Sequence, residues 1–195
     1  MPPKPKITRD ILLAGALDLV REQGVEAINA RNVAARLGCS TQPIFSHFAT
    51  MEDLKTAVHQ EAEQLYNTVM MASMQAGGED FLGMGMAYIH FARTEPQLFQ
   101  LLFMSSSIVQ GDLAEMAGTT QGDDQVIAFL SSKTGLSLSE SQKLYTALWF
   151  TVHGIASLLA TNGCSIDDLE ARTILRHTFK GLIYSLKQER EDNRS

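Results

Sequence analysis

The chain has 195 residues, 45% of them hydrophobic and 19% charged, which is enough for one domain or two small domains with a sizeable core. Only five prolines interrupt long stretches of helical periodicity, and alternating β-type runs are missing, so we predict an all-α fold of about nine helices. The N-terminal residues lack the apolar segment of a secretory signal, and no apolar run reaches the roughly 20 residues of a membrane helix. We therefore expect a cytoplasmic protein with no membrane partner.

Charge is distributed unevenly along the chain, which has a net charge of −6. The first 50 residues contain six basic and four acidic side chains, an excess of +2, so the remainder carries −8. This asymmetry suits a small DNA-facing head on an acidic body. Because the excess is small, we expect the head to bind duplex DNA weakly unless a symmetric dimer doubles the contacts.

The cysteine and histidine positions predict neither a metal site nor a cofactor. Cys39 and Cys164 follow no metal or redox spacing and are expected to be free thiols. His90, His153 and His177 also lack a metal-ligand spacing. The sequence contains no glycine-rich phosphate loop, G-x-S-x-G elbow or H-E-x-x-H motif, so we do not expect an enzyme. A helical-bundle enzyme and a partner-binding adaptor without DNA affinity remain as alternatives.

The first predicted helix begins after a basic, proline-rich arm of residues 1–7, which either contacts phosphates or has no role. Thr8 is placed to cap this helix, and Gly24 to end it. Between them an apolar stripe at helical spacing predicts a buried face. The stripe consists of Leu12, Ala16, Leu19 and Val20.

Residues 29–48, NARNVAARLGCSTQPIFSHF, predict two short helices joined by a turn. Asn29 can cap the first helix, and Gly38 can adopt the left-handed conformation that closes it. Ser40 is predicted to cap the second helix, and Pro43 fits its first turn, where a missing N–H costs nothing. This is the helix-turn-helix arrangement, whose second helix enters a DNA major groove.

The outer face of the second helix is expected to be polar, because Ile44 and Phe48, four residues apart, can both face inward. A glutamine such as Gln42 can pair with adenine, and the methyl group of Thr41 can meet a thymine methyl. His47 suits a phosphate contact or a helix cap. The side chains left outside or on the flank are Thr41, Gln42, Phe45, Ser46 and His47.

This segment resembles the DNA-binding segment of TetR-family transcriptional regulators. The resemblance lies in Val33-Ala34, in Gly38-Cys39-Ser40 and in Phe45-Ser46-His47-Phe48, and it extends to the A-x-x-L-V-x-x-x-G spacing of the preceding helix. Two positions depart from the family: Phe45 stands where tyrosine is usual, and Met51 where lysine is common. The resemblance implies DNA contacts by Arg31, Ser40, Thr41, Gln42, Pro43, Phe45, Ser46 and His47, with Lys55 as a substitute for the lysine replaced by Met51.

A long helix is predicted after the head, from a capping box at residues 50–53 to Gly77-Gly78. Residues 105–122 are expected to form a mobile lid with a short helix near 112–116. The remaining body is helical. Its predicted helices cover residues 80–94, 96–104 and 123–133, then run from Ser137 or Ser139 to Asn162-Gly163, and from a Ser165 cap past Leu186.

Two body segments resemble one class of TetR-family ligand domains: FARTEPQLFQLLF at 91–103, and the W-x-x-x-H-G pattern of Trp149, His153 and Gly154. The resemblance implies a small-molecule pocket, and the aromatic and methionine content of the body agrees with one. Apolar residues at helical spacing are, however, usually plain core, which is the alternative interpretation of each of them. The candidate ligand residues are Met84, Tyr88, Phe99, Phe103, Trp149 and His153.

Together these features predict a ligand-responsive transcriptional regulator with a head of residues 1–50 and a ligand-binding and dimerisation body of residues 51–195. The last two helices carry more apolar surface than one body needs to cover, so we expect them to pair in a homodimer. Such a dimer would place two recognition helices roughly 34–36 Å apart on a palindromic operator. By the majority behaviour of the family the protein is expected to be a repressor released by a small, mainly apolar effector. An activator role stays open.

Overall fold

The computed structural model describes residues 7–76, 81–104 and 123–192. In these ranges it contains nine α-helices, one short 3-10 turn and no strand, which confirms the predicted all-α fold. The expected lid and its short helix near residues 112–116 lie outside the described residues. Within the described ranges, none of the helices combines the length and apolar character that crossing a bilayer requires.

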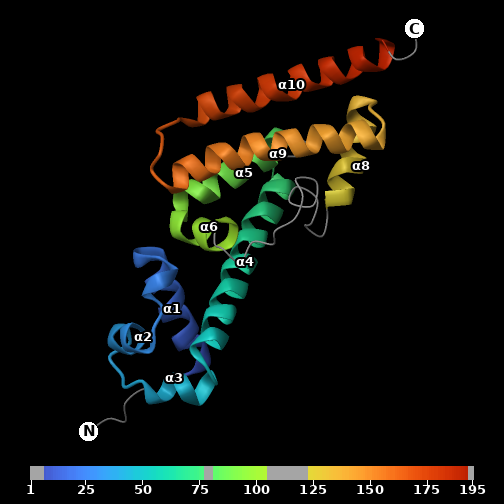
Figure 1. Ribbon diagram of the computed structural model, residues 1–195. Coiled ribbons are helices and arrows are strands. Elements are labelled where there is room, and N and C mark those ends of the chain that lie inside the picture. Colours follow the sequence, from blue (N-terminus) through green and yellow to red (C-terminus); the bar gives the residue numbers. More distant parts are fainter. Residues whose placement is uncertain (1–6, 77–80, 105–122, 193–195) are drawn as a thin grey trace.

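Three short helices form a bundle at one end of the molecule (Figure 1): α1 (Arg9–Gln23), α2 (Ala30–Arg36) and α3 (Gln42–His47). The 3-10 turn η1 (Val25–Ala27) joins α1 to α2. Helix α4 (Met51–Ala76) starts in this bundle and extends as one 26-residue rod into the body, where it ends beneath α9 (Figure 1). The small helices and the large body are therefore bridged by a single continuous helix.

The described part of the body has five helices (Figure 1): α5 (Phe81–Thr94), α6 (Pro96–Phe103), α8 (Asp123–Thr134), α9 (Leu138–Ala160) and α10 (Asp168–Asp192). Helix α5 packs between α4 and α9, while α6 lies on the side nearest the head. Helices α9 and α10 lie side by side at the end farthest from the head. Their outer surfaces are thus free of contact with the head.

Local capping explains where most helices begin. The Thr8 hydroxyl accepts from the Ile11 N–H, and Thr50 and Asp53 form a reciprocal capping box at the start of α4. The capping box of α9 uses Ser137 and Glu140, so of the two predicted alternatives the one starting at Ser139 is wrong.

The predicted Ser165 cap of α10 is also wrong. Asp167 accepts from the Glu170 N–H at 2.8 Å, and the Glu170 carboxylate accepts from the Asp167 N–H. Helix α10 begins at Asp168, two residues later than a Ser165 cap would allow, because this Asp-x-x-Glu pair satisfies the first N–H groups.

The apolar stripes predicted for the head are buried as one core. Leu12, Val33 and Ile44, from three different helices, are 0% exposed. Leu54 and Val58 of α4 are equally buried in the same cluster, so the long helix is also a wall of the head. Removing this apolar surface from water is the main force that holds α2 and α3 together.

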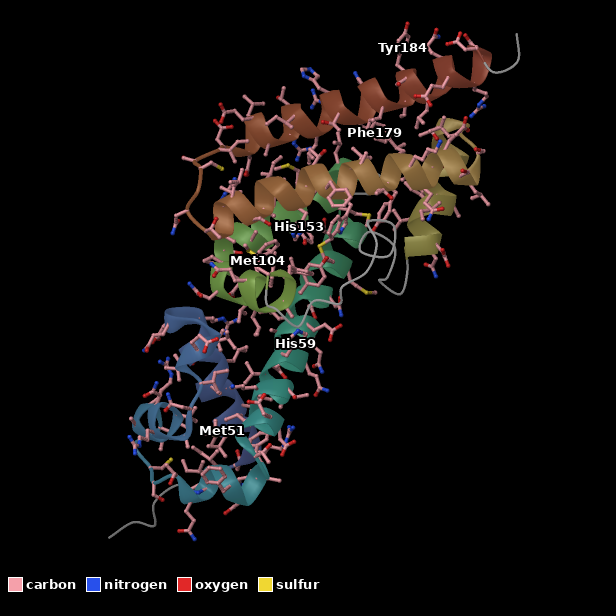
Figure 2. The ribbon with its side chains drawn as sticks, in the orientation of Figure 1. Met51, His59, Met104, His153, Phe179 and Tyr184 are labelled. Atoms are coloured by element: carbon pink, nitrogen blue, oxygen red, sulfur yellow. The ribbon has the colours of Figure 1, made fainter. Side chains whose placement is uncertain are left out.

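A second, smaller core joins α8, α9 and α10 at their far end, where buried leucines meet the half-buried ring of Phe179 (Figure 2). Arginine ion pairs fix α10 at both ends: Arg93 binds Asp168, and Arg190 binds Glu140. The Arg190 guanidinium lowers the pKa of Glu140 to about 2. The outer side of α10 carries exposed side chains, among them Tyr184 (Figure 2).

Candidate functional site

The turn between α2 and α3 has the geometry that its sequence predicts. The Asn29 side chain accepts from the Asn32 N–H at 2.9 Å and caps α2. Gly38, with a φ of 61°, adopts the left-handed conformation just after the helix. The Cys39 N–H then donates to the Ala34 carbonyl at 3.0 Å, which satisfies an otherwise free helix-end carbonyl. This turn sets the direction in which α3 leaves α2.

Helix α3 begins one residue later than expected. Thr41, and not Ser40, holds the N-cap position, and its side chain accepts no hydrogen bond from the first turn. The backbone of Thr41 is already helical, with φ −74° and ψ −14°, whereas a capping side chain normally requires an extended backbone. The Ser40 cap is therefore wrong, while Pro43 does lie in the first turn.

The outer face of α3 is exposed and mostly polar. Ile44 is 0% exposed and Phe48 4%, so these two residues anchor the helix on the head core and turn the opposite face outward. The Ser46 hydroxyl donates to the Gln42 carbonyl at 3.0 Å. Phe45 is 52% exposed, an unusual position for a large apolar ring. Other exposed candidates in and near this face are Arg31, Ser40, Thr41, Gln42, Ser46 and His47; Pro43 is half-buried.

The start of the chain is attached to α3 by contacts that the sequence did not predict. Nε2 of His47 donates to the Ile7 carbonyl at 3.2 Å. The Arg9 guanidinium lies 5.0 Å from the centroid of the Phe48 ring, a cation–π distance. The segment just before α1 therefore lies beside the last turn of α3, and one ring nitrogen of His47 is already engaged.

Charged groups near this surface are partly paired. Lys55, proposed from the sequence as a backbone contact, lies 2.9 Å from Glu52 in an exposed ion pair. Arg36 binds both carboxylate oxygens of Glu22, at 2.7 and 2.9 Å, and thereby lowers the pKa of Glu22. Met51 is half-buried at the start of α4 (Figure 2). Arg31 remains exposed on α2.

In the body, five of the six predicted ligand residues meet in one aromatic cluster, which comprises Tyr88, Phe99, Phe103, Trp149 and His153. The Tyr88 ring is centred 5.4 Å from that of Phe99 and 5.3 Å from that of Phe103. Trp149 stacks on His153 at 4.7 Å with an interplanar angle of 7°. Met84, the sixth, is half-buried four residues before Tyr88 on α5.

Tyr66 of α4 also belongs to this cluster, although the sequence analysis did not name it. Its ring contacts Tyr88 at 6.0 Å and Phe103 at 5.1 Å, both edge-on. The sequence does indicate that Tyr66 faces inward, because Val58, Ala62 and Tyr66 follow one another at four-residue spacing on the buried side of α4. Through Tyr66 the cluster touches the helix that bridges head and body.

One polar contact lies within these rings. The Tyr88 hydroxyl and Nδ1 of His153 are 2.9 Å apart and share a hydrogen bond, with His153 placed on the inner side of α9 (Figure 2). Burial raises the pKa of Tyr88 and lowers the pKa of His153. Both groups are thus neutral near pH 7, and the pair can offer either a donor or an acceptor to a neighbouring polar group.

Two shallow hollows occur elsewhere on the described surface. One, of about 280 Å³, lies between α1 and α2, and the other, of about 360 Å³, lies on α4. Neither is lined by the aromatic cluster, whose rings pack against one another. They are lined by Leu19, Gln23, Asn32, Ala35 and Arg36, and by Asn67, Thr68, Met71 and Ala72, respectively.

Comparisons with known proteins match both parts of the chain. Residues 12–58 match the family described as bacterial regulatory proteins, tetR family, and residues 81–182 match the tetracyclin repressor-like C-terminal domain. An uncharacterised HTH-type transcriptional regulator of Mycobacterium tuberculosis is 26% identical over 174 residues, which cover 87% of this chain and 77% of that protein. A TetR-like transcriptional regulator from Rhodococcus sp. RHA1 has a similar fold, with a TM-score of 0.64 and 16% identity, over 91% of this chain and 98% of that one.

Proposed function

The chain belongs to the TetR family of transcriptional regulators, and we propose that it is a repressor that binds a palindromic operator as a homodimer and is released by a small, mainly apolar effector. In this proposal residues 1–50 are the DNA-binding head, and residues 51–195 bind the effector and dimerise. The matches to two family descriptions, one ending within the first turns of α4 and the other beginning after it, support such a division.

The observation that carries the proposal is the exposed outer face of α3, which two buried anchors, Ile44 and Phe48, hold in one orientation. Gln42 offers an amide that can pair with adenine, and Thr41 a methyl group for thymine. The other candidates, on α3 and on the neighbouring segments, are assigned to positioning on phosphates and sugars, which fixes register without reading sequence. These positioning residues are Arg31, Ser40, Pro43, Phe45, Ser46, His47 and Lys55.

Dimerisation is assigned to α9 and α10. Both helices expose several large apolar side chains, and exposed apolar surface of this kind commonly marks an interface. A two-fold axis there would pair the helices with their mates in a four-helix interface. The exposed apolar residues on these helices are Leu138, Phe150, Leu158, Leu169, Ile174 and Tyr184.

The effector site is assigned to the aromatic cluster. Its rings present apolar faces, and the Tyr88–His153 pair supplies one polar anchor, which suits a planar, mainly apolar molecule with a single hydrogen-bonding group. Trp149 and Phe103 are half-buried, so they form the more accessible side of the cluster; Met84 lies one turn away on α5. The effector can weaken DNA binding by no more than the factor by which its own affinity differs between the DNA-binding state and the released state of the protein.

The direct test is selection of duplexes from a random-sequence DNA pool with the purified full-length chain, alongside its mass by light scattering. We expect a palindromic consensus, a mass of two chains, and affinity that falls steeply with salt. A monomer at micromolar concentration would contradict the dimer, and failure to enrich any duplex would contradict DNA recognition. A panel of small aromatic compounds can then be screened for one that releases the selected duplex; for any that does, Trp149→Ala should weaken the release.

A further inference from the structure

An ion pair joins the head directly to the body. The Arg21 guanidinium of α1 binds the Glu95 carboxylate, which immediately precedes α6: Nε lies 3.0 Å from Oε2 and 3.2 Å from Oε1, and the second terminal nitrogen lies 3.0 Å from Oε1. Both side chains are half-buried, at 34% and 25% exposure. A forked arginine–carboxylate contact of this kind is directional as well as attractive. It therefore fixes an angle between the two elements and not only a distance.

The pair continues as a chain of charges into the helix-turn-helix. Arg21 also contacts Asp18 at 3.4 Å, and Asp18 lies 3.7 Å from Arg36 in the last turn of α2. Arg36 is the residue just before Leu37 and Gly38, which form the turn into α3. An alternating series, Glu95–Arg21–Asp18–Arg36, thus runs from the start of α6 through α1 to the end of α2.

On its other side, α6 belongs to the aromatic cluster. Phe99 and Phe103 come from this eight-residue helix and contact Tyr88. Gln100 donates to the Ala160 carbonyl at 2.6 Å and ties α6 to the end of α9. The eight-residue helix α6 is therefore held on one side by these rings and by α9, and its preceding residue Glu95 holds Arg21 on the other.

The two routes between head and body differ in kind. Helix α1 packs on α4 through apolar side chains of one continuous core, and such packing has no single bond to break. The contact of α1 with α6 includes the forked ion pair. The backbone at Gly24, just after α1, also lies close to α6, because a Cβ on Gly24 would be 2.9 Å from the Gln97 side-chain oxygen. The α1–α6 contact is thus the specific, breakable one.

We propose that Arg21 and Glu95 are positioning residues that set the orientation of the DNA-reading head against the body. This inference rests on the proposed function, because orientation matters only where two heads must match one operator. In the dimer, the pair holds both recognition helices at the separation that the operator requires. Without it, the heads still fold and bind DNA but tolerate a wider range of half-site separations.

The test uses the operator selected by the wild-type chain, rebuilt with its centre lengthened or shortened by one and two base pairs. Glu95→Gln is expected to weaken binding to the native spacing by about two- to five-fold, the size of one partly exposed ion pair. It should also flatten the dependence of affinity on spacing. Arg21→Lys keeps the charge but loses the fork, so an intermediate profile is expected.

A double-mutant cycle identifies the contact itself. Arg21→Gln, Glu95→Gln and their combination should be non-additive, with the double variant no weaker than the worse single variant. A charge swap is unsuitable, because a glutamate at position 21 would face Asp18. The matched control is Asp168→Asn, which breaks the ion pair of Arg93, a side chain as exposed as Arg21, entirely within the body. It should leave the spacing profile unchanged.

The outcomes separate the two claims. A Glu95→Gln variant with the wild-type affinity and spacing profile would overturn the positioning role while leaving DNA recognition intact, and so would equal profiles for Glu95→Gln and Asp168→Asn. A wild-type chain that enriches no duplex would overturn the proposed function and this inference together. Melting curves recorded for every variant show whether a change in DNA binding arises from a folded protein.

Discussion

The recognition segment of the head and the aromatic cluster of the body differ in how their parts are brought together. The head surface comes from 20 consecutive residues, 29–48, whose conformation follows from an asparagine cap, a left-handed glycine and two buried anchors. The aromatic cluster takes its members from α4, α5, α6 and α9, over residues 66–153. One site is thus specified by local interactions and the other by packing, and mutations should affect them differently.

The largest contrast is expected between two phenylalanines. Phe99 is 0% exposed and packs on three aromatic rings, so Phe99→Ala should lower the free energy of unfolding by about 3–5 kcal/mol. Phe45 is 52% exposed, and Phe45→Ala should change the free energy of unfolding by no more than about 0.5 kcal/mol. Urea denaturation followed by circular dichroism measures both. Similar losses for the two variants would contradict the assignment of one ring to packing and the other to an outer surface.

Gly38 tests the local specification of the head. With φ at 61° and open space where a Cβ would lie, Gly38→Val should cost about 1–2 kcal/mol through the backbone alone. Gly38→Asn is the matched control, because asparagine tolerates the left-handed conformation, and its loss should be clearly smaller. Equal melting temperatures for the valine and asparagine variants would mean that the turn does not depend on this conformation.

Tyr88 tests the polar contact of the body. Tyr88→Phe keeps the ring but leaves Nδ1 of His153 without its hydroxyl partner, so we expect a loss of about 1 kcal/mol in the free energy of unfolding. Tyr184→Phe is the control, since Tyr184 is 69% exposed and should tolerate the change. If both substitutions leave the unfolding midpoint unchanged, the Tyr88–His153 bond does not contribute to stability.

The smallest effect is expected at Glu140, whose ion pair with Arg190 holds the end of α10. The pKa of Glu140 is about 2 in the folded protein, below its ordinary value of 4.5, because Arg190 and the Ser137 cap favour the charged form. The stability this gives is therefore complete above pH 4.5 and is lost as the pH falls towards 2. Glu140→Gln should show a shallower loss of melting temperature over that window than the wild type. Parallel curves would contradict a stabilising role for the Glu140–Arg190 ion pair.

The sequence allowed accurate prediction wherever a boundary depends on nearby residues. The caps at Thr8, Asn29 and Thr50 are confirmed, as is the left-handed Gly38. The prediction failed at two helix starts. Helix α3 begins without a side-chain cap and not with a Ser40 cap, and α10 is capped by Asp167 and not by Ser165. Both errors displace a helix start by one or two residues, the range over which helix ends are only weakly determined.

Contacts between helices that are far apart in the sequence were the other feature that could not be predicted from it. The family resemblance and the aromatic content of the body indicated five residues that do meet, but neither says which helix faces touch. Tyr66 of α4 was missed for this reason. The Arg21–Glu95 pair joins residues 74 positions apart, and each alone is an ordinary surface charge. Only the packing of α1 on α6 brings the two together.

The most direct measurement of the central claim, that the exposed face of α3 reads base sequence, compares two glutamines on the selected operator. Affinities for Gln42→Ala and for Gln60→Ala, an exposed position on α4, would be measured against duplexes with every base at each half-site position. We predict that Gln42→Ala loses about ten-fold or more in affinity and discriminates less at one position, in line with one bidentate base contact. Gln60→Ala should match the wild type. A Gln42→Ala variant with unchanged affinity for every duplex would contradict the account.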